Sequence, residues 1–376
     1  MSPEPTNPEP TGTGASGGVP MPAPHPALVT PFCALVGVRY PIVQTGMGWV
    51  AGASLVSATA AAGGLGILAS ATMTLDELEH ALAEVRSRTD APFGVNLRTD
   101  AADVDRRIEL MITAGARVAS FAQAPNPALV ARCQQAGLVV MPTVGARRHA
   151  EKVAGWGVDA VIAQGAEGGG HTGPVPTTLL TPEVVDAVGD KVAVLSAGGY
   201  FNGRGLVAAL AYGASGIAMG TRFLLTTDSK VPDEVKARYL ATPVTGTVVT
   251  TKVDGVPQRV IRTELVDHLE RQSWLRNLPR ALRSAHDFRR DTGSTLADLL
   301  REGRAMKQGN ELDWTDVVMA ANAPVMTKAG LVDGRTDVGV LPTGQVTGVL
   351  DSLPSAAEVI SSIVTEANET LGRLGA

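Results

Sequence analysis

The sequence predicts an α/β protein, a (β/α)8 barrel (TIM barrel) with an inserted, mostly helical lid domain. Short apolar runs recur between Pro41 and Met219, and there are eight of them. Their centres lie roughly 20 to 33 residues apart, the length of one strand and one helix. The segments between the runs carry apolar residues at helical spacing. The regular count of eight favours a closed barrel over the alternative, a doubly wound open sheet.

The predicted strands are short and apolar, as in a parallel sheet buried on both faces. They are Pro41–Gln44, Leu65–Ala69, Phe93–Leu97, Arg117–Phe121, Leu138–Pro142, Ala160–Ala163, Val192–Leu195 and Gly216–Met219. After the second strand, Thr74 and the acidic residues behind it predict the start of a helix. Residues from Ser355 to Leu371 predict the last helix of the barrel, since their apolar positions share one helical face.

Composition changes along the chain predict four parts. Residues 1–26 are rich in Pro and Gly and predict a disordered extension. Residues 27–225 form the predicted barrel. Residues 226–340 are more charged and predict a lid or substrate domain, with a hairpin whose turn is Asp254–Gly255. Residues 341–376 return to the barrel as its C-terminal helix.

The overall charge and composition exclude several classes of function. The 376 residues carry a formal net charge of −5 and only 4 % aromatic residues. This argues against nucleic-acid partners and against attraction to an anionic membrane, and no apolar run is long enough to span a bilayer. Cys33 and Cys133 form no metal-binding pattern, so no metal is expected. Two isolated thiols fit a reducing compartment, and we expect a cytoplasmic location.

A glycine-rich stretch follows the sixth predicted strand and contains His171. Gln164 ends the strand, and the next nine residues include glycines at 165, 168, 169, 170 and 173. Glycines allow a ligand to approach the backbone closely, and a histidine titrates near neutral pH. We interpret the stretch as a cofactor loop with a catalytic histidine. The alternative is a flexible surface loop with an incidental histidine.

Small and amide-bearing residues stand at the ends of the predicted strands, where a barrel gathers its chemistry. This composition suits a flat, hydrogen-bonding cofactor. Glycines after strands seven and eight offer backbone N–H groups where this fold usually holds a phosphate. Each glycine pair alone also fits an ordinary tight turn. The candidate cofactor residues at these strand ends are Gln44, Thr45, Gly46, Asn96, Gln164, Gly169, Gly198, Gly199, Ala218, Met219, Gly220 and Thr221.

The predicted lid carries six arginines between Arg271 and Arg290 and a single acid, Asp287. One interpretation is a site for the phosphates of a large substrate such as a CoA thioester, with Arg276, Arg280 and Arg283 as candidates. The other is a solvated helix face whose arginine stems cover apolar surface.

These motifs together resemble the nitronate monooxygenase (2-nitropropane dioxygenase) family of FMN-dependent barrels, which also includes flavin-dependent enoyl-ACP reductases. The resemblance rests on PIVQTGMG, GGLGILA, PFGVN, QGAEGGGHTG, AGG and MGTRF, and covers about Ala34 to Leu371. It implies that Asn96, Gln164, Gly169, Gly199 and Ala218–Thr221 bind FMN. It also implies that His171 is the active-site histidine.

A narrower resemblance is to an actinobacterial branch of the family that acts in steroid C/D-ring catabolism. That branch uses a hydroindane-carboxyl-CoA intermediate derived from cholesterol. It implies hydride transfer between FMN and a large acyl-CoA substrate, with His171 exchanging the proton. Thr45–Trp49 replaces the Gly/Ala-Pro-Met of the nitronate enzymes, which argues against simple nitroalkane oxidation. The CoA substrate of this branch favours the substrate-binding interpretation of the lid arginines.

Other functions stay open from the sequence. Nitronate oxidation with O2 and flavin-dependent reduction of an enoyl thioester both keep the flavin, and the redox partner is NAD(P)H or O2. A barrel of the IMP dehydrogenase type requires a nucleophilic cysteine in an active-site loop. Cys133 falls in a predicted helix and Cys33 precedes the first strand, so this alternative is disfavoured. A flavin-binding protein without turnover is the remaining alternative.

Overall fold

Eight parallel strands close into a barrel in the computed structural model, which describes residues 19–99, 101–122, 124–271 and 314–375. The predicted (β/α)8 barrel is confirmed. All eight predicted strands are present, and their ends differ from the predicted ones by at most two residues. The barrel strands are β1 (Ile42–Gln44), β2 (Leu65–Ala69), β3 (Phe93–Leu97), β4 (Val118–Phe121), β5 (Val139–Val144), β6 (Ala160–Gln164), β8 (Ala193–Ala197) and β9 (Gly216–Met219).

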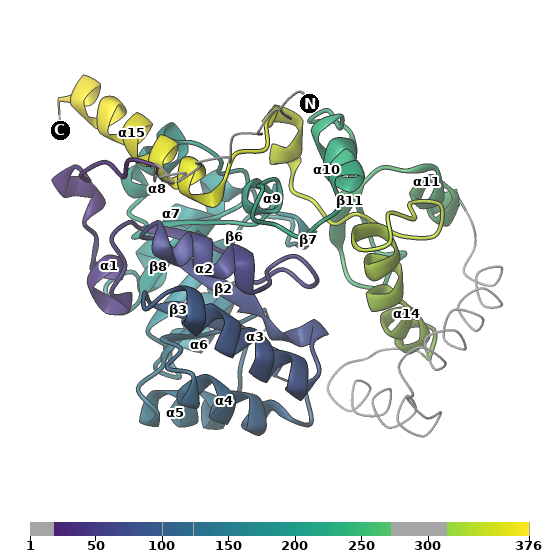
Figure 1. Ribbon diagram of the computed structural model, residues 1–376, viewed down its shortest axis with the longest axis horizontal. Helices are drawn as coiled ribbons and strands as arrows, with labels where there is room; N and C mark the ends of the chain where they lie inside the picture. The colour runs from purple at the N-terminus through teal and green to yellow at the C-terminus, as the bar shows by residue number, and fades with distance from the viewer. Residues whose placement is uncertain (1–18, 100, 123, 272–313, 376) are drawn as a thin grey trace, which may run out of the picture.

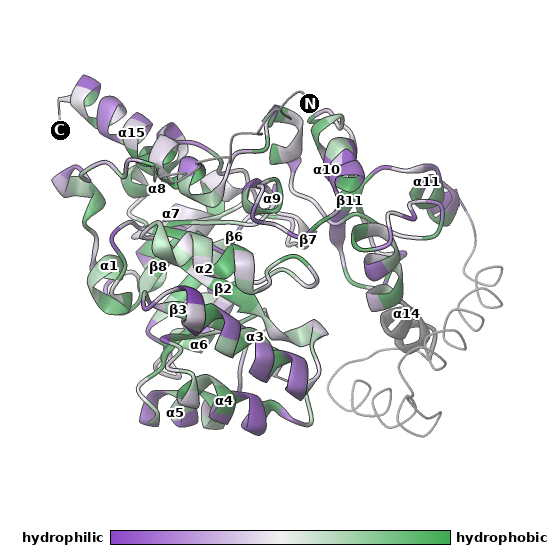
Figure 2. Ribbon diagram, viewed as in Figure 1, coloured by the Kyte–Doolittle hydropathy of each residue, from purple (hydrophilic) through white to green (hydrophobic). Residues whose placement is uncertain are grey.

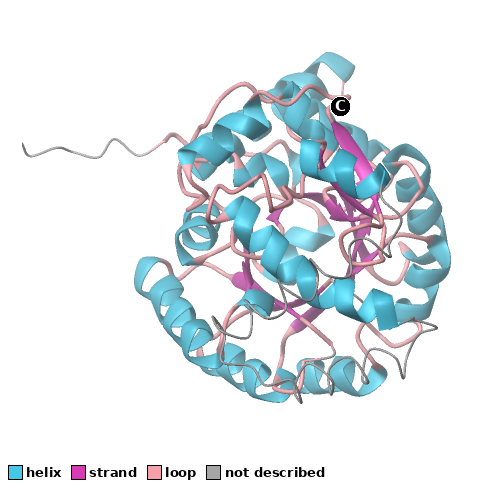
Figure 3. Ribbon diagram, turned by 90° about the vertical axis from the view of Figure 1, so that its right-hand side faces the viewer, coloured by secondary structure: helices cyan, strands magenta, loops and turns pink. Residues whose placement is uncertain are grey.

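Helices surround the strands as a ring, seen along the barrel in Figure 3. A Thr74 capping box starts α3, as the sequence predicted. The last helix packs against α8 and α2 and so completes the ring. The helices of this ring are α2 (Ala53–Ala61), α3 (Leu75–Arg88), α4 (Val104–Thr113), α5 (Pro127–Gln135), α6 (Arg147–Ala154), α7 (Thr177–Val188), α8 (Gly203–Ala211) and α15 (Ala356–Leu374), with a 3-10 turn η2 (Ser70–Thr72) after β2.

The outer helices are amphipathic, and polar positions appear on the outside of α3, α4 and α5 in Figure 2. Leu78, Leu82 and Val85 of α3 are buried against the sheet. Burial of apolar side chains between sheet and helices is the main stabilising contribution to such a fold. Among the described helices, none combines the length and the apolar character that a bilayer crossing requires.

The N-terminal part of the described chain seals one end of the barrel. A 3-10 turn η1 (Pro26–Leu28) leads into α1 (Pro31–Val36). Phe32 and Val36 of α1 are buried in one cluster with Leu65, Val139 and Leu195, which stand at or near the starts of their strands. The open mouth, where the strands end, is therefore at the opposite end.

Residues 19–26 do not behave as the predicted disordered extension. The Tyr40 hydroxyl donates to the Pro22 carbonyl at 2.6 Å, and Asn368 of α15 donates to the Ala23 carbonyl at 2.9 Å. Met21 packs against the cluster of buried residues formed by α8, α15 and their neighbours. A proline-rich segment has few N–H groups, so its carbonyls need outside donors, and α15 and Tyr40 supply them. The remainder of the predicted extension, residues 1–18, lies outside the described residues.

The segment between β9 and α15 gathers at the mouth end of the barrel, opposite α1 (Figure 1). The predicted hairpin is confirmed, since β10 pairs antiparallel with β11 and Asp254–Gly255 lies in the connection. The described elements of this segment are α9 (Thr221–Leu224), α10 (Asp233–Leu240), β10 (Thr247–Thr250), β11 (Gln258–Ile261), α11 (Glu264–Arg271), α14 (Trp314–Leu331) and the 3-10 turn η4 (Gln345–Val349).

Candidate active site

The floor of the barrel mouth is formed at the ends of β1 and β3. The Gln44 side chain is fully buried, and its amide donates to the carbonyls of Thr45 at 2.5 Å and Ile67 at 3.2 Å. Gln44 therefore stabilises the backbone at the end of β1, beneath the mouth, and is not itself open to a ligand. Asn96 is partly exposed, and its Nδ2 lies 3.5 Å from the Ser120 hydroxyl. Gly46 packs so closely on Asn96 that an added Cβ would lie 2.5 Å from the Asn96 Cβ, so this approach requires glycine.

Two glycine turns lie side by side at the mouth because β8 pairs with β9. Gly198 and Gly199 have φ values of +109° and +81°, the left-handed region that favours glycine. Within the described chain, the N–H groups of Gly198, Gly199 and Gly220 donate to no protein acceptor. A Cβ added to Gly199 would meet nothing nearer than the Glu167 Cβ at 3.6 Å. Free donors and open space fit an anionic group such as a phosphate.

Ala218 and Met219 belong to β9, and both side chains are buried. They can offer a ligand only their backbone. Thr45 stands beside them at the end of β1, and its N–H donates to the Met219 carbonyl at 3.1 Å. The structure thus brings the predicted residues of strands one and eight together at one edge of the mouth.

His171 stands in a short strand, and its placement in a loop was wrong. The strand is β7 (Gly170–His171), which pairs antiparallel with β11 and forms a sheet in the order β10-β11-β7. Arg259 of β11 reinforces the pairing, since its Nη2 donates to the Ala166 carbonyl at 2.9 Å. The histidine is therefore held by the segment inserted after β9.

The glycine-rich stretch is also held from the side of residues 343–345. A Cβ on Gly169 would lie 2.5 Å from the Gly344 nitrogen. The Gln345 N–H donates to the Glu167 carbonyl at 3.0 Å, and the Gly344 N–H donates to the Thr221 hydroxyl at 2.9 Å. Residues 165–171, 221 and 344 therefore converge, although they lie far apart in the sequence.

Two side chains hold the turn between β6 and β7. Gln164 donates from Nε2 to the His171 carbonyl at 2.7 Å. The Glu167 carboxylate accepts from the Thr177 N–H at 2.9 Å and from the Thr177 hydroxyl at 2.6 Å. Hydrogen bonds to a charged group are stronger than neutral ones. The position of His171 is thus fixed before any ligand arrives.

His171 pairs with Asp254, which the sequence analysis assigned only to a turn. His171 Nε2 lies 2.6 Å from Asp254 Oδ2. The histidine side chain is 62 % exposed, whereas the aspartate side chain is 9 % exposed. The hydrogen bond to Asp254 raises the pKa of His171 above its usual value and outweighs the opposing effect of burial. The 83 residues between the two positions explain why no local motif indicated the pair.

Trp49 has an unusual backbone conformation at the end of β1. Its φ is +60°, the single positive value outside glycine in the described chain. The Trp49 N–H donates to the Thr72 hydroxyl at 3.3 Å, and a Cβ on Gly48 would lie 2.9 Å from Thr72 Cγ2. A bulky residue in this region is a rare and strained feature. It falls in the Thr45–Trp49 stretch, where the resemblance predicts a departure from the nitronate enzymes.

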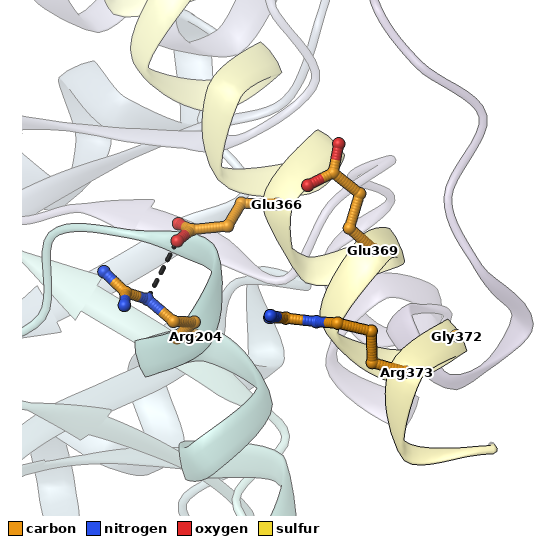
Figure 4. Close-up of a pocket in the computed structure, with 5 residues that line it drawn as sticks. All are labelled: Arg204, Glu366, Glu369, Gly372 and Arg373. Atoms are coloured by element: carbon orange, nitrogen blue, oxygen red, sulfur yellow. Dashed lines mark ion pairs between the residues drawn. The ribbon is translucent and has the colours of Figure 1, made fainter.

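A separate surface hollow of about 580 Å3 lies between α8 and α15 (Figure 4). Arg204 pairs there with Glu366 at 2.9 Å, and Glu369 and Arg373 also line it. None of the predicted site residues lines this hollow. The predicted substrate arginines, Arg276, Arg280 and Arg283, lie outside the described residues.

The fold and this site define a (β/α)8-barrel protein with a glycine-lined mouth and a histidine held beside it. The sequence model of the nitronate monooxygenase family matches residues 30–106 and 98–366. The chain therefore belongs to the nitronate monooxygenase family. Membership implies a flavin, and the free N–H groups of the mouth and the open space at Gly199 fit one.

Known proteins support the narrower resemblance. The chain is 62 % identical over 341 residues to the (3aS,4S,5R,7aS)-5-hydroxy-7a-methyl-1-oxo-octahydro-1H-indene-4-carboxyl-CoA dehydrogenase of Mycobacterium tuberculosis, covering 90 % of this chain and 96 % of the relative. Identity to the enzyme of the same name from Rhodococcus jostii is 55 %, covering 93 % and 98 %. The solved structure of FabK from Thermotoga maritima has a TM-score of 0.73 at 30 % identity, covering 92 % and 98 %. The predicted similarity to the steroid-degrading branch is confirmed.

Proposed function

We propose that the chain is an FMN-dependent dehydrogenase of a hydroindane-type acyl-CoA thioester. The observation that carries this proposal is the 62 % identity, over nine tenths of the chain, to a dehydrogenase of such a thioester. The pair of His171 and Asp254 beside a glycine-lined mouth supports it, because it supplies a proton acceptor next to the proposed flavin site.

Each candidate residue has its own role in this proposal. The N–H groups of Gly198, Gly199 and Gly220 would hold the FMN phosphate, and Asn96 and Gln164 would orient the ring. FMN bound there would supply the two-electron chemistry, as acceptor of the hydride that the substrate carbon loses. His171 takes the proton that the substrate loses in the same oxidation. An external acceptor, NAD(P)+ or O2, then removes the electrons from the protein.

The segment of residues 226–340 serves in this proposal as the substrate domain. Its hairpin already supports His171 through the β7–β11 pairing. Arg276, Arg280 and Arg283 remain sequence-based candidates for the CoA phosphates. Replacing all three with Gln should raise the KM for the thioester and leave kcat nearly unchanged.

Purified protein tests the proposal directly. We expect a yellow preparation that releases FMN on denaturation. Without oxygen, a stoichiometric amount of a hydroindane-carboxyl-CoA thioester should bleach the flavin and yield a product two mass units lighter. Colourless protein that takes up no added FMN would contradict the cofactor. Bound flavin that this thioester does not reduce would contradict the substrate.

Nitronate oxidation is the second candidate, because the matching family carries that name. In the same anaerobic experiment, an alkyl nitronate would then bleach the flavin and the thioester would not. Reduction of oxidised flavin by NADH, followed by reoxidation with an enoyl thioester, would instead indicate a reductase.

A further inference from the structure

We propose that Asp254 is a positioning residue that fixes the protonation pattern of His171, so that Nδ1 is the nitrogen that exchanges a proton with the substrate. This inference deepens the proposed function and rests on it. It concerns a pair formed between the barrel and the inserted hairpin, and it specifies which atom of His171 reacts.

The turn of the hairpin aims the Asp254 carboxylate. Gly255 has a φ of +86°, and the Val256 N–H donates to Asp254 Oδ1 at 3.0 Å. An aspartate that accepts from the residue two positions later forms a local turn. One carboxylate oxygen is thus occupied by the turn, and the other, Oδ2, is directed at His171 Nε2.

The charge of the carboxylate decides which histidine nitrogen carries the proton. An ionised aspartate can only accept hydrogen bonds, so Nε2 must carry the hydrogen that lies between Nε2 and Oδ2. In the neutral ring, Nδ1 is then unprotonated and can accept a proton. Nδ1 has no protein partner within the described chain, and the side chain is 62 % exposed. Nδ1 is therefore available to a substrate.

The backbone of His171 is held on two sides, since its carbonyl accepts from Gln164 and its strand pairs with β11 at the level of Gln258. This places the ring within reach of Asp254, and the Nε2–Oδ2 contact then sets which nitrogen faces the carboxylate. Among the groups of the described chain, Asp254 is the one whose charge raises the pKa of His171. A second carboxylate that could hold Nδ1 instead is not found among those groups.

Substituting Asp254 with Asn gives a sharp test because the turn constrains the amide. The Val256 N–H requires an acceptor, so the amide oxygen should stay at Oδ1 and the NH2 group should face His171 Nε2. That group donates, and it would favour a ring protonated at Nδ1. We expect D254N to keep its fold and its flavin, and to lose roughly tenfold or more in kcat. D254A should lose activity to a similar extent with a mixture of ring forms.

Histidine 15N NMR reads the ring directly and needs no substrate. In the flavin-loaded wild type, at an alkaline pH where the ring is neutral, we expect an Nε2–H form for His171, identified by loss of its signals in H171A. In D254N the Nδ1–H form should dominate. D337N removes an exposed acid of the same segment, whose side chain is 69 % exposed, and should match the wild type in both measurements.

The outcomes separate the inference from the proposed function. An Nδ1–H form in the wild type, or D254N with wild-type kcat and pH profile, would overturn the inference while leaving the dehydrogenase proposal standing. If the Nε2–H form is present but H171A turns over the thioester normally, the pair is structural, and the inference fails together with the proposed role of His171, while the dehydrogenase assignment stands. If the flavin-loaded protein turns over only a nitronate, the substrate assignment fails, and a changed pH profile in D254N for that reaction would still support the role of Asp254.

Discussion

The barrel and the inserted segment contribute to the same site by different means. The barrel side offers backbone, with unpaired N–H groups at Gly198, Gly199 and Gly220 within the described chain and open space at Gly199. The inserted side offers side chains, with Asp254 and Arg259 holding the histidine strand. Backbone donors tolerate changes of side chain elsewhere, whereas a side-chain pair depends on two specific residues. Loss of a single side chain should therefore affect proton transfer far more than flavin binding.

The largest expected effect comes from His171→Ala. We expect turnover to fall by roughly 10²-fold or more, because a positioned acid or base contributes about that much. Flavin content should be unchanged, since the FMN contacts proposed here are elsewhere. Steady-state kinetics and the visible spectrum check both statements. His149→Ala, on an exposed face of α6, is the control, and equal activity of the two variants would contradict the role of His171.

Gly169→Ala should disturb the packing of the glycine-rich stretch on the barrel side of the site. Its Cβ would lie 2.5 Å from the Gly344 nitrogen, which is a backbone atom and cannot move aside easily. We expect a loss of about 1–3 kcal/mol in the free energy of unfolding, with weaker FMN retention. Thermal unfolding and flavin titration measure this. Gly372→Ala, which lies in α15 with open space around it, should lower neither quantity, because Ala is a better helix former than Gly.

Glu167→Gln tests the turn that joins the two sides. Both Thr177 groups donate to the same Glu167 oxygen, Oε2, so a glutamine oxygen can replace it as acceptor but without the negative charge that strengthens these bonds. We expect a cost of roughly 1–3 kcal/mol in stability and a smaller loss of kcat than in H171A. Urea unfolding gives the first value. Glu84→Gln, which removes an exposed ion pair with Arg88, should cost less than about 1 kcal/mol.

The pH dependence should follow the direction of the His171 shift. Asp254 raises the His171 pKa, so kcat/KM should rise with pH and level off above that raised value. D254A should move this limb to lower pH. For stability the sign is opposite: the contribution of the pair is present below the unfolded pKa, near 6.5, and is lost as pH rises through the folded value. D254A should therefore lose more stability at acidic than at alkaline pH.

The smallest effect is expected at the cysteines. Both thiols are buried, and burial raises the pKa of Cys133 to about 11, so little reactive thiolate forms at neutral pH. Iodoacetamide should leave the native protein active, and Cys133→Ala should retain full turnover. Rapid inactivation by alkylation would revive the interpretation of the chain as a barrel with a nucleophilic cysteine.

The sequence predicted most of the barrel and less of the site, for physical reasons. Strands such as Phe93–Leu97 are local apolar runs, so their pattern is visible in a short window. The turn at Asp254–Gly255 was equally visible, but its pairing with His171 depends on antiparallel register with a two-residue strand. The tight contact of Gly169 with Gly344 likewise has no local pattern. Residues 19–26 looked disordered because their partners lie on α15, at the other end of the chain.

His171 and its partners lie far apart in the sequence, so a ribosome synthesises them at different times. The last barrel strand ends at Met219, so a nascent chain can close its sheet at that stage. Asp254 emerges afterwards, and Gly344, which bonds to Thr221 across 123 residues, emerges later still. A growing chain therefore acquires all eight barrel strands before it acquires its reactive pair, and α15, which completes the ring of helices, is synthesised last.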